Sequence, residues 1–246
     1  NYPNKTLSGL RIIANPPYKE GAKGNIWIPI IDKLVDSNLA SMSLILPVAI
    51  SSSKRTQFLR NKIFTNFKKI YAFHHEIRPC PLFRGVDQRI SIITATKNLI
   101  TPHEYITTGF LKHTAGNRMM VWKAPMTKLS KNQCNNVFPK VSPLDIAFFK
   151  EFESGKNRVR LSEITITTEH TTEVWIRTTG RYHLLAQYEK PAEITTKWKR
   201  LLIPDHIASN FMQAFKNGDL LKWWQIFGDG RDISITSLYN NYRICL

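Results

Sequence analysis

The chain has few cysteines and no long apolar run. Its 246 residues contain only Cys80, Cys134 and Cys245, which are odd in number, widely spaced and outside any C-x-x-C pair. The sequence therefore indicates neither a disulfide framework nor a zinc site, and we expect no bound metal. No stretch reaches the roughly 20 apolar residues that span a bilayer, and none resembles a secretory signal. We expect a protein of the reducing cytoplasm with no membrane partner.

Acidic residues are also scarce. There are 18 Asp and Glu against 35 Lys and Arg, which gives a formal net charge of +17. Such an excess favours a polyanionic partner, with nucleic acid first. A basic protein that binds nothing acidic stays open, because the charges are spread along the chain. Hydrophobic residues at 42% and aromatic residues at 11% predict a folded protein.

The first hundred residues alternate between strand and helix patterns. A continuous apolar run over 42–50 is typical of a strand buried on both faces. Apolar residues at helical spacing predict helices over 26–39 and 54–67. Further strands are expected at 10–14, 69–73 and 90–96. This rhythm predicts an α/β fold with an open sheet covered by helices.

A change in composition near residue 100 predicts a domain boundary. Thr101-Pro102 closes an apolar strand, and a more irregular segment follows. Residues 101–246 mix polar connections and aromatics with short strand candidates at 163–168 and 173–178. We therefore expect two domains, 1–100 and 101–246, the second of the α+β class.

The run Asn15-Pro16-Pro17-Tyr18 follows the first apolar strand directly. Two prolines cannot continue a helix or a sheet ladder, so the loop is stiff. The Asn15 amide oxygen and the Pro16 carbonyl can accept hydrogen bonds from an exocyclic amine, and Tyr18 offers a flat ring for stacking. This pattern suits methyl transfer to the amine of a flipped base, with catalysis by positioning and electrostatics. An ordinary strand-to-loop stop is the plain alternative.

Several linked segments occur in one order. The Asn-Pro-Pro-Tyr loop is followed by a helix, then by Ser43-Leu44-Ile45-Leu46-Pro47, then by another helix and the run Leu82–Ile93. In this the sequence resembles the gamma-type adenine DNA methyltransferases of restriction-modification systems, strongly to residue 97 and loosely beyond. The run Leu221–Asp232 is similar to the closing segment of their recognition region. The resemblance implies a partial Rossmann-like methyltransferase sheet in 1–100 and a DNA target-recognition domain in 101–246.

The resemblance also implies roles for residues. Asn15, Pro16, Pro17 and Tyr18 would bind and activate the target adenine, and Phe83 would pack against it. An equally plain reading makes Phe83 a core residue. The family binds S-adenosylmethionine at a glycine-rich turn, but Gly9 is the one glycine before Asn15. We therefore expect the S-adenosylmethionine site to be completed either by a missing N-terminal half or by a second polypeptide.

Basic residues supply the candidate DNA contacts. Lys and Arg make most phosphate contacts, and Arg also reads base edges. Taken singly, each is more readily explained as a solvated surface charge, and only as a set near the loop do they favour DNA contacts. The candidates are Lys19, Lys23, Lys54, Arg55, Arg84, Arg89, Arg118, Lys123, Arg177 and Arg181.

Together these features predict a subunit or fragment of an adenine-specific DNA methyltransferase that acts on duplex DNA. A non-catalytic DNA-binding or specificity subunit is the alternative. Methylation of RNA or of a protein glutamine is a third possibility, because enzymes for those substrates share the tetrapeptide.

Overall fold

The chain forms two compact units in a computed structural model, Asn1–Ile146 and Ala147–Leu246. The structure describes residues 7, 9–18, 20–21, 24–83, 85–97, 103–164, 170–179, 184–193, 195, 197–229 and 232–245. The predicted boundary near residue 100 is wrong, because β7 (Glu104–Leu111) and β8 (Thr127–Ser130) extend the first sheet.

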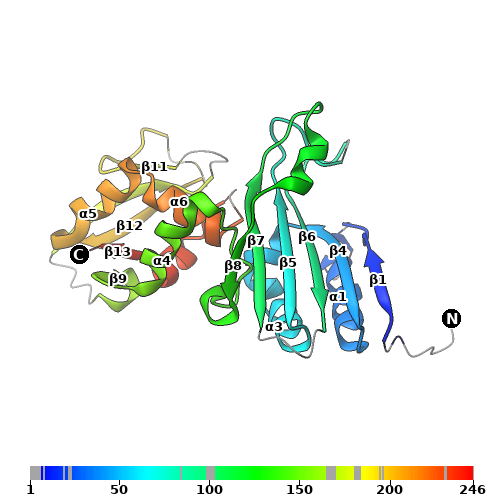
Figure 1. Cartoon of the computed structure of the whole chain (residues 1–246). Helices are drawn as coiled ribbons and strands as arrows, with labels where there is room; N and C mark the ends of the chain where they lie inside the picture. Colours follow the sequence, from blue (N-terminus) through cyan, green and yellow to red (C-terminus); the bar gives the residue numbers. More distant parts are fainter. Residues whose placement is uncertain are drawn as a thin grey trace. The chain divides into compact units, whose positions relative to one another are not determined.

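A six-stranded mixed sheet forms the first unit (Figure 1). Its order is β1-β4-β6-β5-β7-β8, with β1 (Arg11–Ala14) at one end. β4 (Ser41–Pro47) pairs parallel with β1, and β5 (Lys69–His75) pairs parallel with β7. β6 (Ile90–Thr96) runs antiparallel between β4 and β5. Consequently β1, β4, β5 and β7 share one direction, and the loops that follow them meet at one edge, here called the carboxyl edge. The predicted α/β class is confirmed to this extent.

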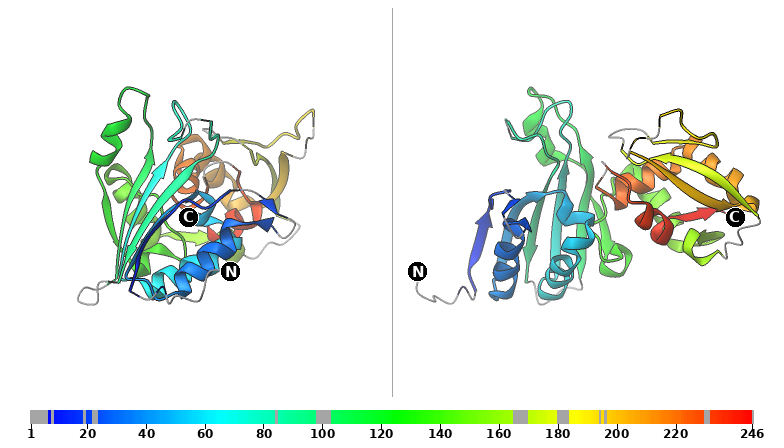
Figure 2. Two further views of the ribbon diagram at one scale, coloured as in Figure 1. Left: turned by 90° about the vertical axis from the view of Figure 1, so that its right-hand side faces the viewer. Right: turned by 180° about the vertical axis from the view of Figure 1, so that it is seen from behind.

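Two helices lie side by side on one face of this sheet (Figure 2). They are α1 (Trp27–Asp36) and α3 (Gln57–Asn66), with α2 (Ala49–Ser52) and η1 (Lys54–Thr56) before α3. α1 buries Trp27, Ile31 and Val35, which lie four residues apart and so share one helical stripe. Lys62 on α3 bonds Asp32 of α1 at 2.5 Å and ties the two helices together.

β4 is buried on its helix side alone. Met42, Leu44 and Leu46 are buried, whereas the residues between them are half-buried. The prediction that this run is buried on both faces is therefore wrong for the described chain. A strand alternates its side chains between two faces, and here one face lacks a helical cover. We call this second face the open face, and register places on it Ile13, Ser43, Ile45, Tyr71, Phe73, Ile92 and Thr94.

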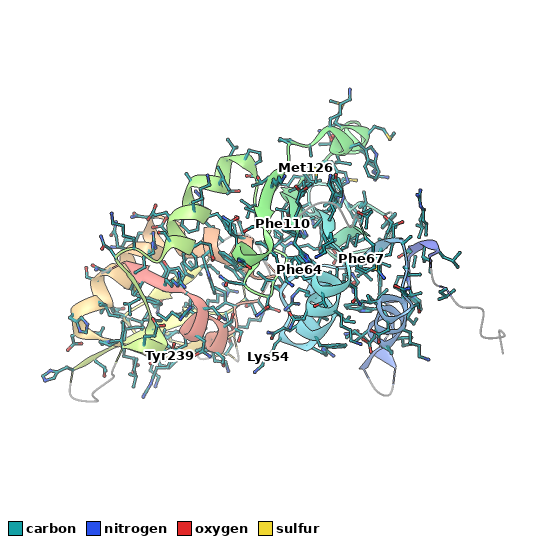
Figure 3. All side chains as sticks on the ribbon, turned by 60° about the horizontal axis from the view of Figure 1, so that its bottom comes forward. Lys54, Phe64, Phe67, Phe110, Met126 and Tyr239 are labelled. Atoms are coloured by element: carbon teal, nitrogen blue, oxygen red, sulfur yellow. The ribbon has the colours of Figure 1, made fainter. Side chains whose placement is uncertain are left out.

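Aromatic side chains close the core beneath β5 and β7. Phe64 and Phe67, labelled in Figure 3, are buried at the end of α3. The Phe64 ring meets Phe138 edge-on with centroids 5.1 Å apart, and Phe138 stacks on Tyr105 of β7 at 5.5 Å. Such pairs add about 0.5–1.5 kcal/mol each beyond area burial. They fix the segment after β8, which includes η3 (Lys131–Cys134) and η4 (Pro143–Asp145), against α3 and β7.

The second unit has a three-stranded antiparallel sheet in the order β11-β10-β12. These strands are β10 (Thr171–Arg177), β11 (Leu185–Gln187) and β12 (Trp198–Pro204), and β9 (Arg158–Arg160) pairs separately with β13 (Arg243–Cys245). Around them lie α4 (Ile146–Ser154), α5 (Asp205–Lys216), α6 (Asp219–Phe227) and α7 (Ile235–Asn241). The core contains Val174, Ile203, Phe211, Trp223 and Trp224. The strand predicted at 173–178 is confirmed, whereas Glu163 ends the turn η5 (Leu161–Glu163) and 165–169 lie outside the described residues.

No helix among the described residues is long and apolar enough to cross a bilayer.

Candidate functional site

The loop Asn15–Tyr18 leaves β1 at the carboxyl edge of the sheet. Asn15 and Pro17 are exposed, Pro16 is buried, and Tyr18 is half-buried. The Tyr18 hydroxyl lies 2.8 Å from Asn15 Oδ1 and 2.8 Å from the Ile45 carbonyl of β4, and its single hydrogen is shared between these two oxygens. Burial raises the pKa of Tyr18 to about 12, so the phenol stays protonated and remains a donor. The hydroxyl thus ties the loop to the neighbouring strand.

This contact orients the Asn15 amide. An amide oxygen has two lone pairs, and the Tyr18 hydroxyl engages one. The other is left for an incoming N–H donor on the exposed side of the loop. Because both prolines fix φ, the backbone between Asn15 and Tyr18 is stiff. The loop therefore presents the Asn15 oxygen as a preset hydrogen-bond acceptor on a rigid backbone.

Other candidate residues gather at the same edge. Lys54 and Arg55 follow β4 through α2 and are exposed, and Figure 3 labels Lys54. Tyr18 is followed by the small hairpin of β2 (Glu20–Gly21) and β3 (Gly24–Asn25). A Cβ added to Gly24 would lie 3.8 Å from Arg55 Nη1. Arg55 therefore stands beside the hairpin that continues the Asn15 loop.

Phe83 lies in the loop 76–89 that follows β5. It is half-buried, and its carbonyl accepts from the Val86 amide at 3.2 Å. In the sheet, β4 and β6 stand between β1 and β5. At about 4.8 Å per strand, the loop begins roughly 14 Å from Asn15 along the edge. Phe83 shares the edge with Asn15, but no contact joins them directly.

Arg89 does not suit the DNA contact that the sequence predicted. Its Nε lies 2.7 Å and 2.9 Å from the two carboxylate oxygens of Glu76, and the two side chains are 5% and 3% exposed. Its guanidinium also lies 5.1 Å from the Phe110 ring centroid. A buried ion pair of this kind is a structural element, and here it joins the two ends of the loop 76–89.

Arg118 is likewise committed within the protein. It opens η2 (Arg118–Lys123) in the loop after β7, and its Nη2 donates to Cys80 Sγ at 3.2 Å and to the Pro81 carbonyl at 3.3 Å. This side chain positions one loop on another, which the sequence did not predict. Lys123 at the end of η2 is exposed, as a DNA contact requires.

The positions of the remaining basic candidates neither support nor oppose DNA contacts. Arg177 ends β10 in the second unit and is half-buried. Lys19, Lys23, Arg84 and Arg181 lie outside the described residues.

Two histidines at the carboxyl edge were not predicted as a pair. His75 ends β5 and His113 follows β7, with ring centroids 6.1 Å apart. Both are buried, and neither ring has a hydrogen-bond partner in the described structure. Burial first, then the charge of His113, lowers the pKa of His75 to about 4. Within the described ranges no group of three or more His, Cys, Asp and Glu side chains could hold a metal.

His74, next to it, belongs to a buried polar network. Its Nδ1 lies 2.8 Å from Ser91 Oγ, its Nε2 lies 3.3 Å from the Tyr105 hydroxyl, and Ser51 Oγ lies 3.0 Å from Ser91 Oγ. Burial lowers the pKa of His74 well below its usual value. A fully buried neutral imidazole of this kind joins α2, β5, β6 and β7 and gives no access to a substrate.

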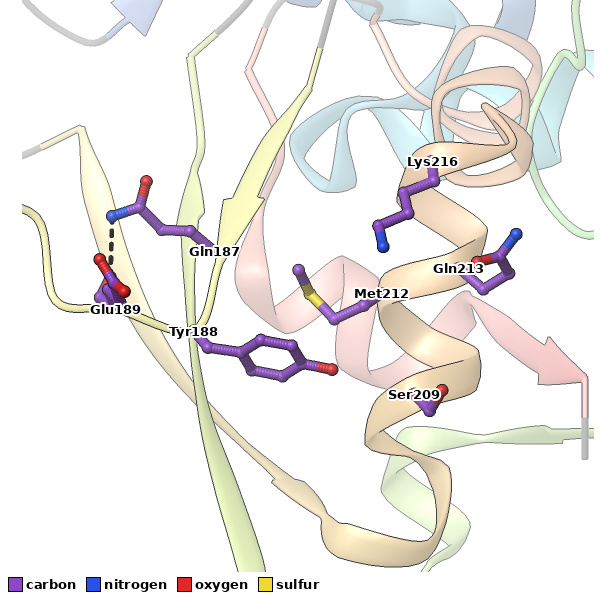
Figure 4. A pocket seen from close by; sticks show the side chains of 7 residues that line it. All are labelled: Gln187, Tyr188, Glu189, Ser209, Met212, Gln213 and Lys216. Atoms are coloured by element: carbon purple, nitrogen blue, oxygen red, sulfur yellow. Dashed lines mark hydrogen bonds between the residues drawn. The ribbon is translucent and has the colours of Figure 1, made fainter.

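The second unit has a shallow hollow of about 390 Å³ between β11 and α5 (Figure 4). Gln187 Nε2 donates to the Glu189 carbonyl at its rim, at 2.8 Å. No residue that the sequence singled out lines it. The lining residues are Gln187, Tyr188, Glu189, Ser209, Met212, Gln213 and Lys216.

Comparison with known proteins finds no family model and no curated protein that matches the chain. Among solved structures, the chain is similar to a nuclease-deletion mutant of the Type ISP restriction-modification enzyme LlaGI, determined in complex with a DNA substrate mimic. The match has 14% sequence identity and a TM-score of 0.41, and it covers 69% of this chain and 20% of that one. It is a distant structural similarity to about a fifth of that enzyme.

Proposed function

We propose that the chain is a subunit or fragment of an adenine-specific DNA methyltransferase. It would transfer a methyl group from S-adenosylmethionine to N6 of a flipped adenine in specific duplex DNA, with a second polypeptide completing the cofactor site. The observation that carries the proposal is the Asn15–Tyr18 loop, in which the Tyr18 hydroxyl orients the Asn15 amide oxygen at the carboxyl edge. In open α/β sheets ligands bind outside the carboxyl ends of parallel strands.

The loop's chemistry suits an exocyclic aromatic amine. The Asn15 oxygen and the Pro16 carbonyl would accept the two amine hydrogens, which draws the nitrogen from planar toward tetrahedral and frees its lone pair. The half-buried Tyr18 ring would stack on the base while its hydroxyl holds Asn15. When bound, S-adenosylmethionine supplies an electrophilic methyl group.

A second polypeptide is favoured by the apolar surface beside the loop. In the described chain β1 is the end strand of the sheet, and Ile13 on it is 86% exposed. Ile45, Phe73 and Ile92 on the open face are only half-buried. An unpaired strand edge next to an apolar face that is only partly covered is suited to strand addition by another chain.

The catalytic assignment can be tested in the complex with the product of the neighbouring gene. Methyl transfer to adenine-containing duplexes would be measured for the unmodified chain, for Asn15→Ala and for Asn61→Ala, an exposed asparagine on α3. Loss of one preorganised hydrogen-bond partner of a reacting group lowers kcat by about 10²–10³-fold. The kcat of the Asn15→Ala complex should therefore fall by that factor. Asn61→Ala should be unaffected.

Two other outcomes would redirect the proposal. A complex that binds S-adenosylmethionine and DNA but retains full activity in Asn15→Ala would reject the catalytic role. A complex that binds DNA without methylating it would point to a specificity subunit. RNA and a glutamine peptide offered in parallel would test the substrate class.

The partner surface has its own test. Ile13→Lys places a charge at the β1 edge, and Leu144→Lys places one at a residue that is 93% exposed on η4. We expect the first substitution to abolish co-purification with the second polypeptide and the other to preserve it. Equal co-purification of both variants would place the partner elsewhere.

A further inference from the structure

The loop after β7 presents three large apolar side chains to solvent at its tip, which is the turn η2 (Arg118–Lys123). Met119, Met120 and Trp122 on η2 are 75%, 57% and 60% exposed. Figure 1 shows η2 as the green helical turn beyond the carboxyl end of β7. Large apolar side chains gathered on one short turn mark an interaction site, whereas single exposed ones are ordinary.

The tip is held firmly. Asn117 Oδ1 accepts from the Thr114 amide at 2.7 Å, and Val121 between the exposed residues is buried. The Trp122 ring meets Phe73 edge-on, with centroids 6.4 Å apart. Arg118 adds its bonds to Cys80 and Pro81. The exposed side chains are therefore displayed on a preformed turn, so a partner would not have to order it.

The charge around the tip selects the kind of partner. Residues 112–126 contain the exposed Lys112 and Lys123 and no Asp or Glu, whereas Arg118 is held by Cys80 and Pro81. The adjoining loop carries an exposed Arg78 and an exposed Asp87. A basic rim around an apolar centre suits duplex DNA, because its phosphates are anionic and its stacked bases have flat apolar surfaces.

We infer that Met119, Met120 and Trp122 form a wedge that enters the base stack of duplex DNA. The inference rests on the proposed function, since it requires DNA as the substrate. Methionine and other apolar side chains inserted between base steps unstack and kink a duplex, and an indole can stack on an exposed base. β7 lies four strand spacings from β1, or roughly 19 Å, so the wedge would act at a different step from the target adenine.

A salt series separates the wedge from electrostatic contacts. Binding to a fluorescent duplex would be measured for Met119→Ser/Met120→Ser, which keeps the Trp122 packing, and for the triple variant with Trp122→Ser. The loss of an apolar contact weakens binding by the same factor at every salt concentration. We therefore expect the double variant to bind the duplex about 10-fold more weakly, with an unchanged slope of log affinity against log salt concentration. Lys123→Ala should instead reduce the slope by about 1. Leu144→Ser, on η4, is the control and should change neither.

A second readout reports the kink. Energy transfer between dyes on the two duplex ends should rise when the unmodified chain binds and should not rise with the double variant. Asn15→Ala should retain the rise while losing methyl transfer in the complex, so the wedge and the catalytic assignment can fail separately. Unchanged affinity and unchanged energy transfer in the double variant would overturn the wedge. So would a change from dimer to monomer in sedimentation, which would make the tip a contact between copies of the chain.

Discussion

Removing the Arg89 guanidinium should destabilise the first unit strongly. Arg89→Ala would leave the Glu76 carboxylate buried without its guanidinium partner, while the Ile77 amide still donates to it at 2.8 Å. Breaking one side of a buried ion pair costs about 3–5 kcal/mol. The lost stacking on Phe110, which lies 5.1 Å away, adds about 1 kcal/mol. The free energy of unfolding of a domain is about 5–15 kcal/mol, so the variant should lose a large part of its stability.

Urea unfolding followed by far-UV circular dichroism measures this loss. The double variant Arg89→Met/Glu76→Leu should recover most of the free energy of unfolding, because replacing both partners of a buried pair with apolar side chains is often neutral or stabilising. Lys54→Ala, at an exposed cation, should change it by less than about 0.5 kcal/mol. If Arg89→Ala unfolds like the unmodified chain and instead lowers the salt slope of DNA binding, then Arg89 is a DNA contact and the reasoning from burial is refuted.

Three further outcomes are expected from other parts of the structure. Tyr18→Phe should lower the free energy of unfolding by about 1 kcal/mol through its lost hydrogen bonds, which urea unfolding would detect. Because the pKa of His75 is about 4 in the folded chain against about 6.5 unfolded, the unfolded state binds the extra proton between these values. The contribution of neutral His75 to the free energy of unfolding is therefore complete above about pH 6.5 and falls by about 2 kcal/mol from pH 7 to pH 5. His75→Gln should remove this dependence of stability on pH. Gly228→Ala would place a Cβ 2.6 Å from Trp224 Cδ1 and should cost about 1–3 kcal/mol in thermal unfolding, whereas Gly116→Ala meets nothing within 4 Å and should cost little.

The strands and helices of the first unit could largely be predicted from the sequence. The strand expected at 10–14 is β1, and the helix expected at 26–39 is α1. The helix ends at Asp36 because Asn38 has φ of 54°, a left-handed conformation that stops it. Such local signals lie within a few residues of the elements they decide.

Long-range packing could not be read in the same way. The ends of β7 and β8 give no sign that these strands extend the first sheet, so the domain boundary was misplaced. The pairing of Arg89 with Glu76 depends on how the loop between them folds back. The exposure of Trp122 could not be foreseen either, because a tryptophan is usually a core residue and its surroundings here come from a loop that projects beyond the sheet.

The two prolines after β1 have a consequence for the chain on its own. β1 is the end strand of the described sheet, and a free strand edge invites pairing between copies and aggregation. Pro16 and Pro17 have no amide hydrogen to offer, so the ladder cannot continue past Ala14. The unpaired edge of β1 is thereby limited to four residues. The same pair that stiffens the loop should thus limit polymerisation of the chain in the absence of the second polypeptide proposed above.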